Sequence, residues 1–353
     1  MSASRPAAVI VLAAGGGTRM RSAIPKALHR VCGQTMLGHC MAAAAELDPR
    51  RLIVVVGHGA DQVGAHASEQ VPGAVIVVQD YLGGTGHAVR VALESVGTIS
   101  GTVIVTYADA PLLRGSTLAA LAAERDRSGA AAAVLTAQAP DPTGYGRIIR
   151  NTRGEFASIV EQADATEDQR AITEINSGMY AFDGDLLADA VKRVRTHNTQ
   201  GEEYLTDAVC VLHADGHQVV TVNCPDFEEI QGVNDLTQLA QVNRLMNSRL
   251  LESAMRTGVR IADPESTWID VTVSLNAGAY IGPSTQLEGR TTVAAGASVG
   301  PGCLLRDTVV GSGATVIKSV CESAVIGDDA HVGPFAHLMP GSRVDAGKPA
   351  QGK

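Results

Sequence analysis

Short apolar runs alternate with amphipathic stretches over residues 7–230. Some of the runs are rich in β-branched residues and almost free of polar ones, as parallel strands buried on both faces are. We therefore predict core strands at Ala8–Ala13, Arg51–Val56, Ala74–Val78, Thr102–Thr106 and Ala131–Thr136. The segments between them predict helices at Met36–Leu47, His87–Ser95 and Ser116–Ser128. This alternation is typical of βαβ units around a Rossmann-like, mostly parallel sheet.

The pattern changes twice beyond residue 230. Leu236–Arg256 carries apolar residues at helical spacing, which predicts a polar connecting helix. After it, apolar residues recur every six positions, and a small residue, often glycine, follows many of them. The recurring positions are Ile281, Leu287, Val293, Val299 and Leu305 and, after an irregular stretch, Ile326, Val332, Leu338 and Val344. This spacing belongs to neither helices nor ordinary strands and predicts a short parallel β-helix of hexapeptide repeats.

The length of 353 residues is more than one core usually supports. We expect an α/β domain over residues 1–233, a helical arm over 234–258 and a β-helix domain over 259–353. The 28 Lys and Arg against 37 Asp and Glu give a net charge of −9, which argues against nonspecific binding of nucleic acid and favours small-molecule partners.

Targeting signals are not recognisable in the sequence. Glycines interrupt the first apolar run after a few residues, and no run is long enough to span a membrane, so we expect neither a signal peptide nor a membrane partner. The cysteines are scattered without metal-ligand spacing, which favours buried, reduced thiols and a cytoplasmic location. They are Cys32, Cys40, Cys210, Cys224, Cys303 and Cys321.

The first candidate for chemistry is the glycine-rich segment after the first strand, LAAGGGTRM followed by Pro25-Lys26. A loop at the carboxyl end of a strand is where open α/β sheets bind ligands. Glycines let backbone N–H groups approach a phosphate chain, and Arg19 and Lys26 add two cations. A tight turn with two solvated cations remains the alternative for the loop alone, because the segment fits neither the P-loop nor the GxGxxG pattern.

The run LAAGGGTRMRSAIPK resembles the signature of sugar-nucleotide pyrophosphorylases. The likeness is closest to the bifunctional N-acetylglucosamine-1-phosphate uridylyltransferase/glucosamine-1-phosphate acetyltransferase family, whose β-helix is left-handed. It continues in order through Gln79, GTGHA at 84–88, YADAPL at 107–112, GYGRI at 144–148, VEQ at 160–162, EINSG at 174–178 and GVN at 232–234. The resemblance implies a magnesium-dependent enzyme that joins UTP and a sugar-1-phosphate, with an acetyltransferase part that is truncated here.

The resemblance also assigns roles to residues of this chain. It implies that Arg19 and Lys26 are catalytic and stabilise phosphate charge, that Gln79 and Gly84 recognise uracil, and that Asp109 and Asn234 coordinate Mg²⁺. Gly146, Glu161 and Asn176 are expected to hold the amino sugar. The remaining expected substrate-binding residues are Leu12, Ala13, Ala14, Gly15, Thr85 and Tyr107, with Asn234 also counted among them.

Several of these roles make chemical sense by themselves. Gln79 offers a paired donor and acceptor for an imide edge. Asp109 ends an apolar strand, and a carboxylate with one neutral oxygen ligand suits Mg²⁺, although a helix cap or a turn before Pro111 would also explain it. His87 is expected to be a helix-start residue and not a general base, because the attacking sugar phosphate is already an anion.

The chain departs from the family pattern at three places. Ala108 replaces the usual glycine before the metal aspartate, and Gly83 replaces a leucine, so the sugar is less firmly indicated than the reaction. Met339 replaces an arginine that binds sugar phosphate in the β-helix, and a thioether cannot take that role. The sequence also ends at Lys353, before the coils that carry the family's acetyltransferase histidine, so we expect no acetyl transfer.

Two alternatives remain open. A related transferase of specialised metabolism would use another sugar-1-phosphate or another nucleoside triphosphate, and a catalytically inactive scaffold would bind the nucleotide without reaction. The retention of Arg19, Lys26, Asp109 and Asn234 together favours an enzyme. A homotrimer through the β-helix is the expected assembly, by the same resemblance.

Overall fold

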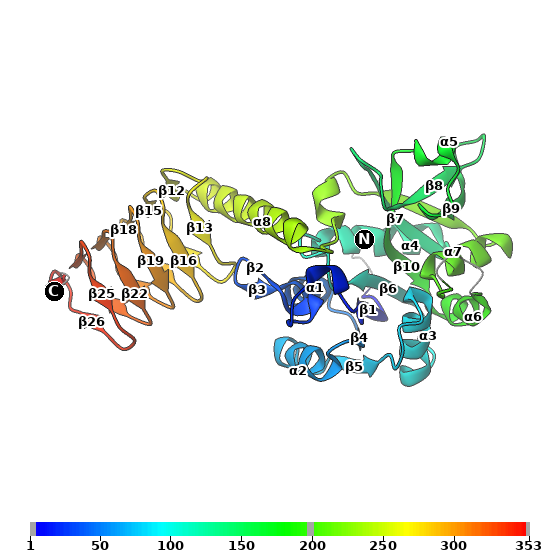
Figure 1. Ribbon diagram of the computed structural model, residues 1–353, viewed down its shortest axis with the longest axis horizontal. Coiled ribbons are helices and arrows are strands. Elements are labelled where there is room, and N and C mark those ends of the chain that lie inside the picture. The colour runs from blue at the N-terminus through cyan, green and yellow to red at the C-terminus, as the bar shows by residue number, and fades with distance from the viewer. Residues whose placement is uncertain (1–4, 196–200, 351–353) are drawn as a thin grey trace. The chain divides into compact units, whose positions relative to one another are not determined.

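The computed structural model describes residues 5–195 and 201–350. They divide into two compact units (Figure 1). The first unit contains Met1–His29 and Thr35–Leu239, and the second contains Arg30–Gln34 and Ala240–Lys353. The boundaries of the three domains expected from the sequence remain predictions.

A mixed sheet forms the centre of the first unit and confirms the Rossmann-like prediction. Its strand order is β11-β7-β10-β6-β1-β4-β5, and all neighbours are parallel except β10, which runs antiparallel to both β6 and β7. The five predicted strands are present with bounds shifted by two residues at most. The strands are β1 (Ala8–Ala13), β4 (Leu52–Val56), β5 (Val75–Val78), β6 (Thr102–Tyr107), β7 (Ala132–Gln138), β10 (Glu174–Asp183) and β11 (Val219–Asn223).

Helices cover both faces of this sheet, which explains the continuous apolar character of its strands. Alternate residues of a strand point to opposite faces. Ile10 and Leu12 of β1 belong to one apolar cluster with helices α3, α6 and α7, whereas Val9 and Val11 belong to a second cluster with α1, α2 and α4. The helices are α1 (Met36–Ala45), α2 (Ala60–Gln70), α3 (Thr85–Val96), α4 (Gly115–Ser128), α6 (Gly184–Arg193) and α7 (Leu205–Ala214).

The antiparallel part of the first unit was not predicted. A hairpin of β8 (Gly146–Arg150) and β9 (Phe156–Val160) pairs with the start of β10, where Asn176 faces Gly146. Because β10 is antiparallel to β6, its first residues lie at the same sheet edge as the carboxyl end of β6. The short elements are η1 (Thr18–Met20), η2 (Lys26–Leu28), η3 (Phe227–Ile230), α5 (Glu167–Arg170) and the ribbon β2 (Arg30–Val31) with β3 (Gln34–Thr35).

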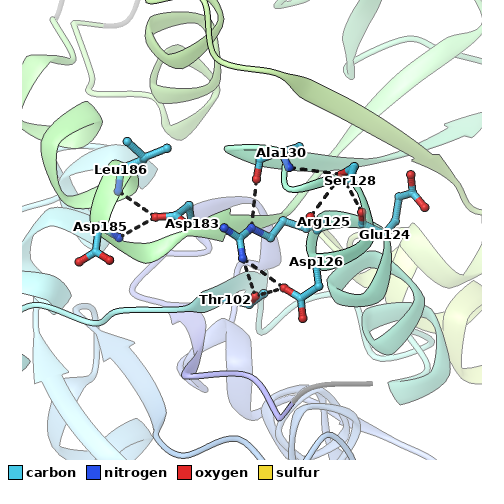
Figure 2. Close-up of polar contacts among 9 residues, drawn as sticks. All are labelled: Thr102, Glu124, Arg125, Asp126, Ser128, Ala130, Asp183, Asp185 and Leu186. Atoms are coloured by element: carbon cyan, nitrogen blue, oxygen red, sulfur yellow. Dashed lines mark hydrogen bonds and ion pairs between the residues drawn. The ribbon is translucent and has the colours of Figure 1, made fainter. Parts of the chain in front are cut away.

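A polar cluster around Arg125 of α4 secures β10 at the opposite edge (Figure 2). Its guanidinium donates to Thr102 Oγ1 at 3.0 Å, to the Ala130 carbonyl at 3.1 Å, and to the carboxylate of Asp183. Asp183 in turn caps α6 by accepting from the backbone N–H of Leu186 at 3.3 Å. One arginine thus connects β6, β7, β10 and a helix start at the end of the sheet away from the candidate site.

The second unit confirms the β-helix. Its strands form three parallel sheets, and each sheet takes every third strand of the sequence, for example β12, β15 and β18. This is the arrangement of a left-handed parallel β-helix. In chain order, the strands of the successive coils are β12 (Arg260–Ile261), β13 (Trp268–Ile269), β14 (Ser274–Leu275), β15 (Tyr280–Ile281), β16 (Gln286–Glu288), β17 (Thr292–Val293), β18 (Ser298–Val299), β19 (Leu304–Arg306), β20 (Val309–Val310), β21 (Thr315–Val316), β22 (Val320–Glu322), β23 (Val325–Ile326), β24 (His331–Val332), β25 (His337–Leu338), β26 (Arg343–Val344) and β27 (Pro349–Ala350).

The irregular stretch in the six-residue repeat has a structural cause. Val310, Val316 and Cys321 occupy the same inward positions as the predicted residues and are buried. The steps from Leu305 to Val310, from Val316 to Cys321 and from Cys321 to Ile326 are five residues instead of six, because three of the turns are one residue shorter. The β-helix core is therefore continuous where the sequence count breaks.

The predicted arm is helix α8 (Leu236–Arg256). Its later residues pack on the first coils, where Leu251 is part of the β-helix core. The buried Asn247 donates to the Thr267 carbonyl at 2.8 Å and accepts from the Ile269 N–H at 3.0 Å, so it satisfies backbone groups beside the first coil. No helix among the described residues is long and apolar enough to cross a membrane.

All six cysteines are free, and five are buried. Burial raises the pKa of the Cys321 thiol to about 12, and it raises the pKa of Cys40 as well. Both thiols therefore remain protonated near neutral pH, as expected of core residues.

Candidate active site

The predicted site residues gather at the carboxyl edge of the central strands. The glycine loop follows β1, Gln79 follows β5, and Asp109 follows β6. Backbone hydrogen bonds continue beyond these strands, from Ala108 N to the Leu12 carbonyl at 3.0 Å and from Gln79 N to the Val56 carbonyl at 2.8 Å. The site thus stands on backbone fixed by neighbouring strands.

A cavity of about 320 Å³ opens at this edge. Its walls come from the glycine loop, the start of α3, the end of β6 and the segment before α7. The predicted residues that line it are Leu12, Ala13, Ala14, Gly15, Lys26, Gln79, Gly84, Thr85, Tyr107 and Asp109. Glu202 also lines it and was not predicted.

Lys26, Asp109 and Asn234 form a tight polar cluster at one end of this cavity. The Lys26 ammonium lies 2.6 Å from Asp109 Oδ2 and 3.0 Å from Asn234 Oδ1. Arg19 is exposed and donates to the same Asn234 oxygen at 3.1 Å. The lysine and aspartate side chains are only 14% and 27% exposed, so their charges interact with little screening by water. The cluster presents two cations and two oxygen ligands at one point.

Gln79 lies at another part of the cavity wall and is almost fully buried. Its Nε2 donates to the Gly84 carbonyl at 3.1 Å and contacts His87 Nδ1 at 2.8 Å. Burial and the positive charge of Arg90 lower the pKa of His87 below its usual 6.5, so the imidazole is neutral at physiological pH. Because the amide nitrogen of Gln79 can only donate, Nδ1 of the neutral ring is the acceptor and the ring proton lies on Nε2.

A second hollow of about 180 Å³ shares Tyr107 and Asp109 with the first. It is also lined by Tyr145 and Ser177, the sequence neighbours of Gly146 and Asn176. These two predicted sugar residues face each other between β8 and β10, although neither lines the hollow directly.

Glu161 and Asn176 belong to a buried hydrogen-bond chain. Thr206 Oγ1 donates to Glu161 Oε1 at 3.0 Å and contacts the Tyr180 hydroxyl at 3.3 Å, to which Asn176 Nδ2 donates at 2.8 Å. Burial raises the pKa of the Glu161 carboxyl above its usual 4.5, and the bond from Thr206 partly opposes this rise. Thr206 and Tyr180 were not predicted, because their role depends on a contact between distant elements.

Tyr107 separates the two hollows. Its pKa is raised by burial and by the nearby carboxylates of Asp109 and Glu161, so the phenol stays neutral. The β10 bulge bends around the ring, and Gly178, at φ 80°, has no room for a Cβ, which would lie 2.7 Å from Tyr107 Cε2. A glycine is needed there for both space and backbone conformation.

The structure therefore brings the predicted residues together at one sheet edge, in two groups on either side of Tyr107. No group of three or more His, Cys, Asp or Glu side chains in the described ranges is arranged to hold a metal. The oxygens of Asp109 and Asn234 nevertheless converge on one ammonium, so the two side chains face a single positive charge.

Comparison with known proteins agrees with this geometry. Residues 9–177 match the MobA-like NTP transferase domain. The fold and this match define a nucleotidyltransferase.

The chain is also similar over nearly its whole length to proteins named "Bifunctional protein GlmU". It is 53% identical to the one from Streptomyces avermitilis over 348 residues, which are 98% of this chain and 72% of that protein. It is 54% identical to the one from Thermobifida fusca over 331 residues, 93% of this chain and 68% of that protein. For Corynebacterium efficiens the identity is 44% over 354 residues, 98% and 72% of the two chains. The chain belongs to the GlmU family and is a sugar-1-phosphate nucleotidyltransferase of the uridylyltransferase type.

Proposed function

We propose that this enzyme forms UDP-N-acetylglucosamine and pyrophosphate from UTP and N-acetylglucosamine-1-phosphate, with Mg²⁺ as cofactor. The observation that carries the proposal is the cluster of Lys26, Arg19, Asp109 and Asn234 beside a cavity lined by the glycine loop. Such a cluster binds a polyanion together with a divalent ion.

Asp109 and Asn234 would hold the Mg²⁺. Their oxygens already converge on the Lys26 ammonium, and one carboxylate with one amide oxygen is a ligand set that Mg²⁺ accepts when phosphates and waters complete its shell. When bound, the ion neutralises phosphate charge and orients the triphosphate. Lys26 would then turn from Asp109 to the phosphates.

The proposed reaction is a single in-line displacement. A phosphate oxygen of the sugar phosphate bonds to the α-phosphorus of UTP while the bond from that phosphorus to the bridging oxygen breaks, and the electron pair leaves with pyrophosphate. The attacking oxygen is already anionic, so no general base is needed. Lys26 and Arg19 stabilise the negative charge that shifts onto the leaving group, and most of the catalysis comes from positioning and electrostatics.

The two hollows divide the substrates. Gln79 and Gly84 border the first and are proposed to recognise the uracil, with Thr85 close to the nucleotide. The second hollow is proposed to bind the sugar, with Glu161, Asn176 and Gly146 near its lining residues. Glu161 would accept a hydrogen bond from a sugar hydroxyl or amide. Thr206 is proposed to hold the Glu161 carboxylate in place.

Substrate profiling tests this proposal. Pyrophosphate release is measured with UTP, dTTP and GTP, each against N-acetylglucosamine-, glucose- and galactose-1-phosphate. The largest kcat/KM is expected for UTP with N-acetylglucosamine-1-phosphate. A larger kcat/KM with a different pair of substrates would show that the enzyme makes another sugar nucleotide. Calorimetry that shows UTP binding, without any release of pyrophosphate, would indicate a nucleotide-binding scaffold.

Three further parts of the proposal concern the β-helix and the cell. Met339 is 56% exposed and carries no charge for a sugar phosphate, which supports the absence of acetyl transfer by this chain. Thiol release from acetyl-coenzyme A in the presence of glucosamine-1-phosphate would contradict this. We also assign the chain a homotrimeric assembly through the β-helix and a cytoplasmic location, for which the six free cysteines are suited.

A further inference from the structure

The side chain of Gln79 is fixed from behind by two hydrogen-bond acceptors. The Gly84 carbonyl can only accept, and it lies 3.1 Å from Nε2. His87 Nδ1 lies 2.8 Å from the same nitrogen and therefore also accepts. An amide nitrogen has two N–H groups, and these two partners use both.

The carbonyl oxygen Oε1 of Gln79 is thus the atom left for a ligand. No protein hydrogen bond to it is found in the described part of the chain, and Gln79 lines the cavity. A nucleobase that meets Gln79 here has to donate a hydrogen bond. Where N3 of the base faces Oε1, uracil offers an N–H, whereas cytosine has a lone pair that would face the lone pairs of Oε1; the 4-amino donor of cytosine lies one atom away from this contact.

The imidazole of His87 is held in its own place by Tyr81. The two ring centroids are 4.2 Å apart and the planes are tilted by 30°. His87 is 4% exposed and Tyr81 is 61% exposed, so the tyrosine covers the outer side of the histidine. Gly83 makes this stack possible, because a Cβ there would lie 2.7 Å from Tyr81 Cε2 and 2.8 Å from His87 Cγ.

We propose that His87, held by Tyr81 over Gly83, is a positioning residue that fixes the amide of Gln79 and thereby selects a pyrimidine with an N3–H over one with a lone pair at N3. The inference rests on the proposed function, since it assumes that the uracil of UTP occupies this cavity. His87 takes no proton in the reaction and does not touch the reacting atoms.

The ratio of kcat/KM for UTP to that for CTP tests the inference. In His87→Leu the acceptor is lost and Gln79 can rotate, so the ratio is expected to fall by about tenfold or more, mainly through a higher KM for UTP. His87→Asn is the matched variant, because its Oδ1 takes the place of Nδ1 and can accept the same bond; it is expected to keep most of the ratio. An unchanged ratio in His87→Leu would overturn the proposal.

A pH profile provides a second readout. Protonated His87 cannot accept from Gln79, so the KM for UTP is expected to rise as pH falls through the lowered pKa of His87. The charged groups that act on His87 are Arg90 and Glu94 of α3, Glu203 of the segment before α7, and Asp80 after β5. His87→Asn shares these groups and the titration of UTP itself but lacks the imidazole. An identical acid limb in both proteins would contradict the proposal.

Gly83→Ala tests the stack without removing the histidine. The new methyl group would lie 2.7 Å from Tyr81 Cε2 and 2.8 Å from His87 Cγ and Nδ1, so it is expected to push the two rings apart and to move the imidazole away from Gln79. A reduced UTP-to-CTP ratio supports the role of the stack, and an unchanged ratio refutes it. If the unaltered enzyme shows no turnover with UTP, the proposed function itself fails, which is distinct from either result with the variants.

Discussion

Single residues at this site have environments that their sequence neighbours do not reveal. Lys26 is close to Asp109 and Asn234 in space, although 83 and 208 positions separate them along the chain. The glycine loop and the strand-terminal aspartate were recognisable in sequence because their chemistry is local. Thr206, Tyr180 and Glu202 were not, because they reach the site through the packing of the segment around α7 against β9 and β10.

Lys26 can be tested directly against a neighbouring cation. Lys26→Ala removes the charge that contacts Asp109 and is proposed to stabilise the phosphates, so kcat should fall by on the order of 10²-fold or more. Arg21→Ala, on the same loop but exposed, removes an equal charge and should change kcat by less than about threefold. Steady-state pyrophosphate release measures both. Equal losses in the two variants would mean that general charge, not position, matters.

Glu161 gives a pH-dependent prediction. Its carboxyl has a raised pKa, so it becomes protonated at a higher pH than an ordinary glutamate as the solution is acidified. A protonated carboxyl accepts hydrogen bonds poorly, and the KM for the sugar phosphate should therefore rise as pH falls through that pKa.

Glu161→Gln supplies the control for this pH effect. It should have a KM for sugar phosphate about tenfold or more above that of the unaltered enzyme at neutral pH, because a charged acceptor is lost. It should also lack the additional rise in acid. If both proteins show the same pH profile, the titration belongs to the substrate and not to Glu161.

Among the helices and strands, apolar periodicity predicted those whose buried residues recur at a regular interval. The strands buried on both faces and the six-residue coils were found because each has one simple apolar pattern. Strand β10 was missed because it mixes buried and half-buried residues and contains the bulge from Asn176 to Tyr180. The hairpin β8–β9 was missed because its alternation is incomplete, with Ile149 half-buried next to the buried Ile148.

The five-residue steps place Val310 in the β-helix core, and this placement can be tested by stability measurements. Val310 is buried at 1% exposure, whereas its neighbour Val309 is 44% exposed. Val310→Ala should lower the free energy of unfolding by about 1–3 kcal/mol, through lost burial and a residual cavity. Val309→Ala should lower it by less than about 0.5 kcal/mol.

Chemical denaturation followed by circular dichroism measures both valine variants. Uridylyltransferase kinetics should stay unchanged in each, because the site residues belong to the first unit. Equal destabilisation by the two variants would contradict the assigned inward positions.

At the scale of the whole molecule, the sequence indicated an α/β enzyme followed by a β-helix, and the structure and the GlmU relatives agree. The shift between six- and five-residue steps was beyond the sequence pattern, because it depends on how each turn is closed against the coil below. The choice of sugar is proposed to depend on contacts of Glu161, Asn176 and Gly146 near the second hollow, which no short motif encodes.

The proposed homotrimer can be tested by the mass of the protein in solution. Light scattering coupled to size exclusion should give a mass about three times the 36.5 kDa of one chain, as the homotrimer requires. Dilution should not change the mass if the β-helix interface is large and apolar. A single-chain mass at micromolar concentration would remove the trimer from the account.

A crystal structure with UTP, Mg²⁺ and a non-reactive analogue of the sugar phosphate would test the proposed active site directly. We expect the uracil beside Gln79, the ion bound between Asp109 and Asn234 in the position that the Lys26 ammonium now takes, and Lys26 turned to the phosphates. Density for the triphosphate away from the glycine loop, or an ion that leaves both Asp109 and Asn234 uncoordinated, would contradict the proposed site.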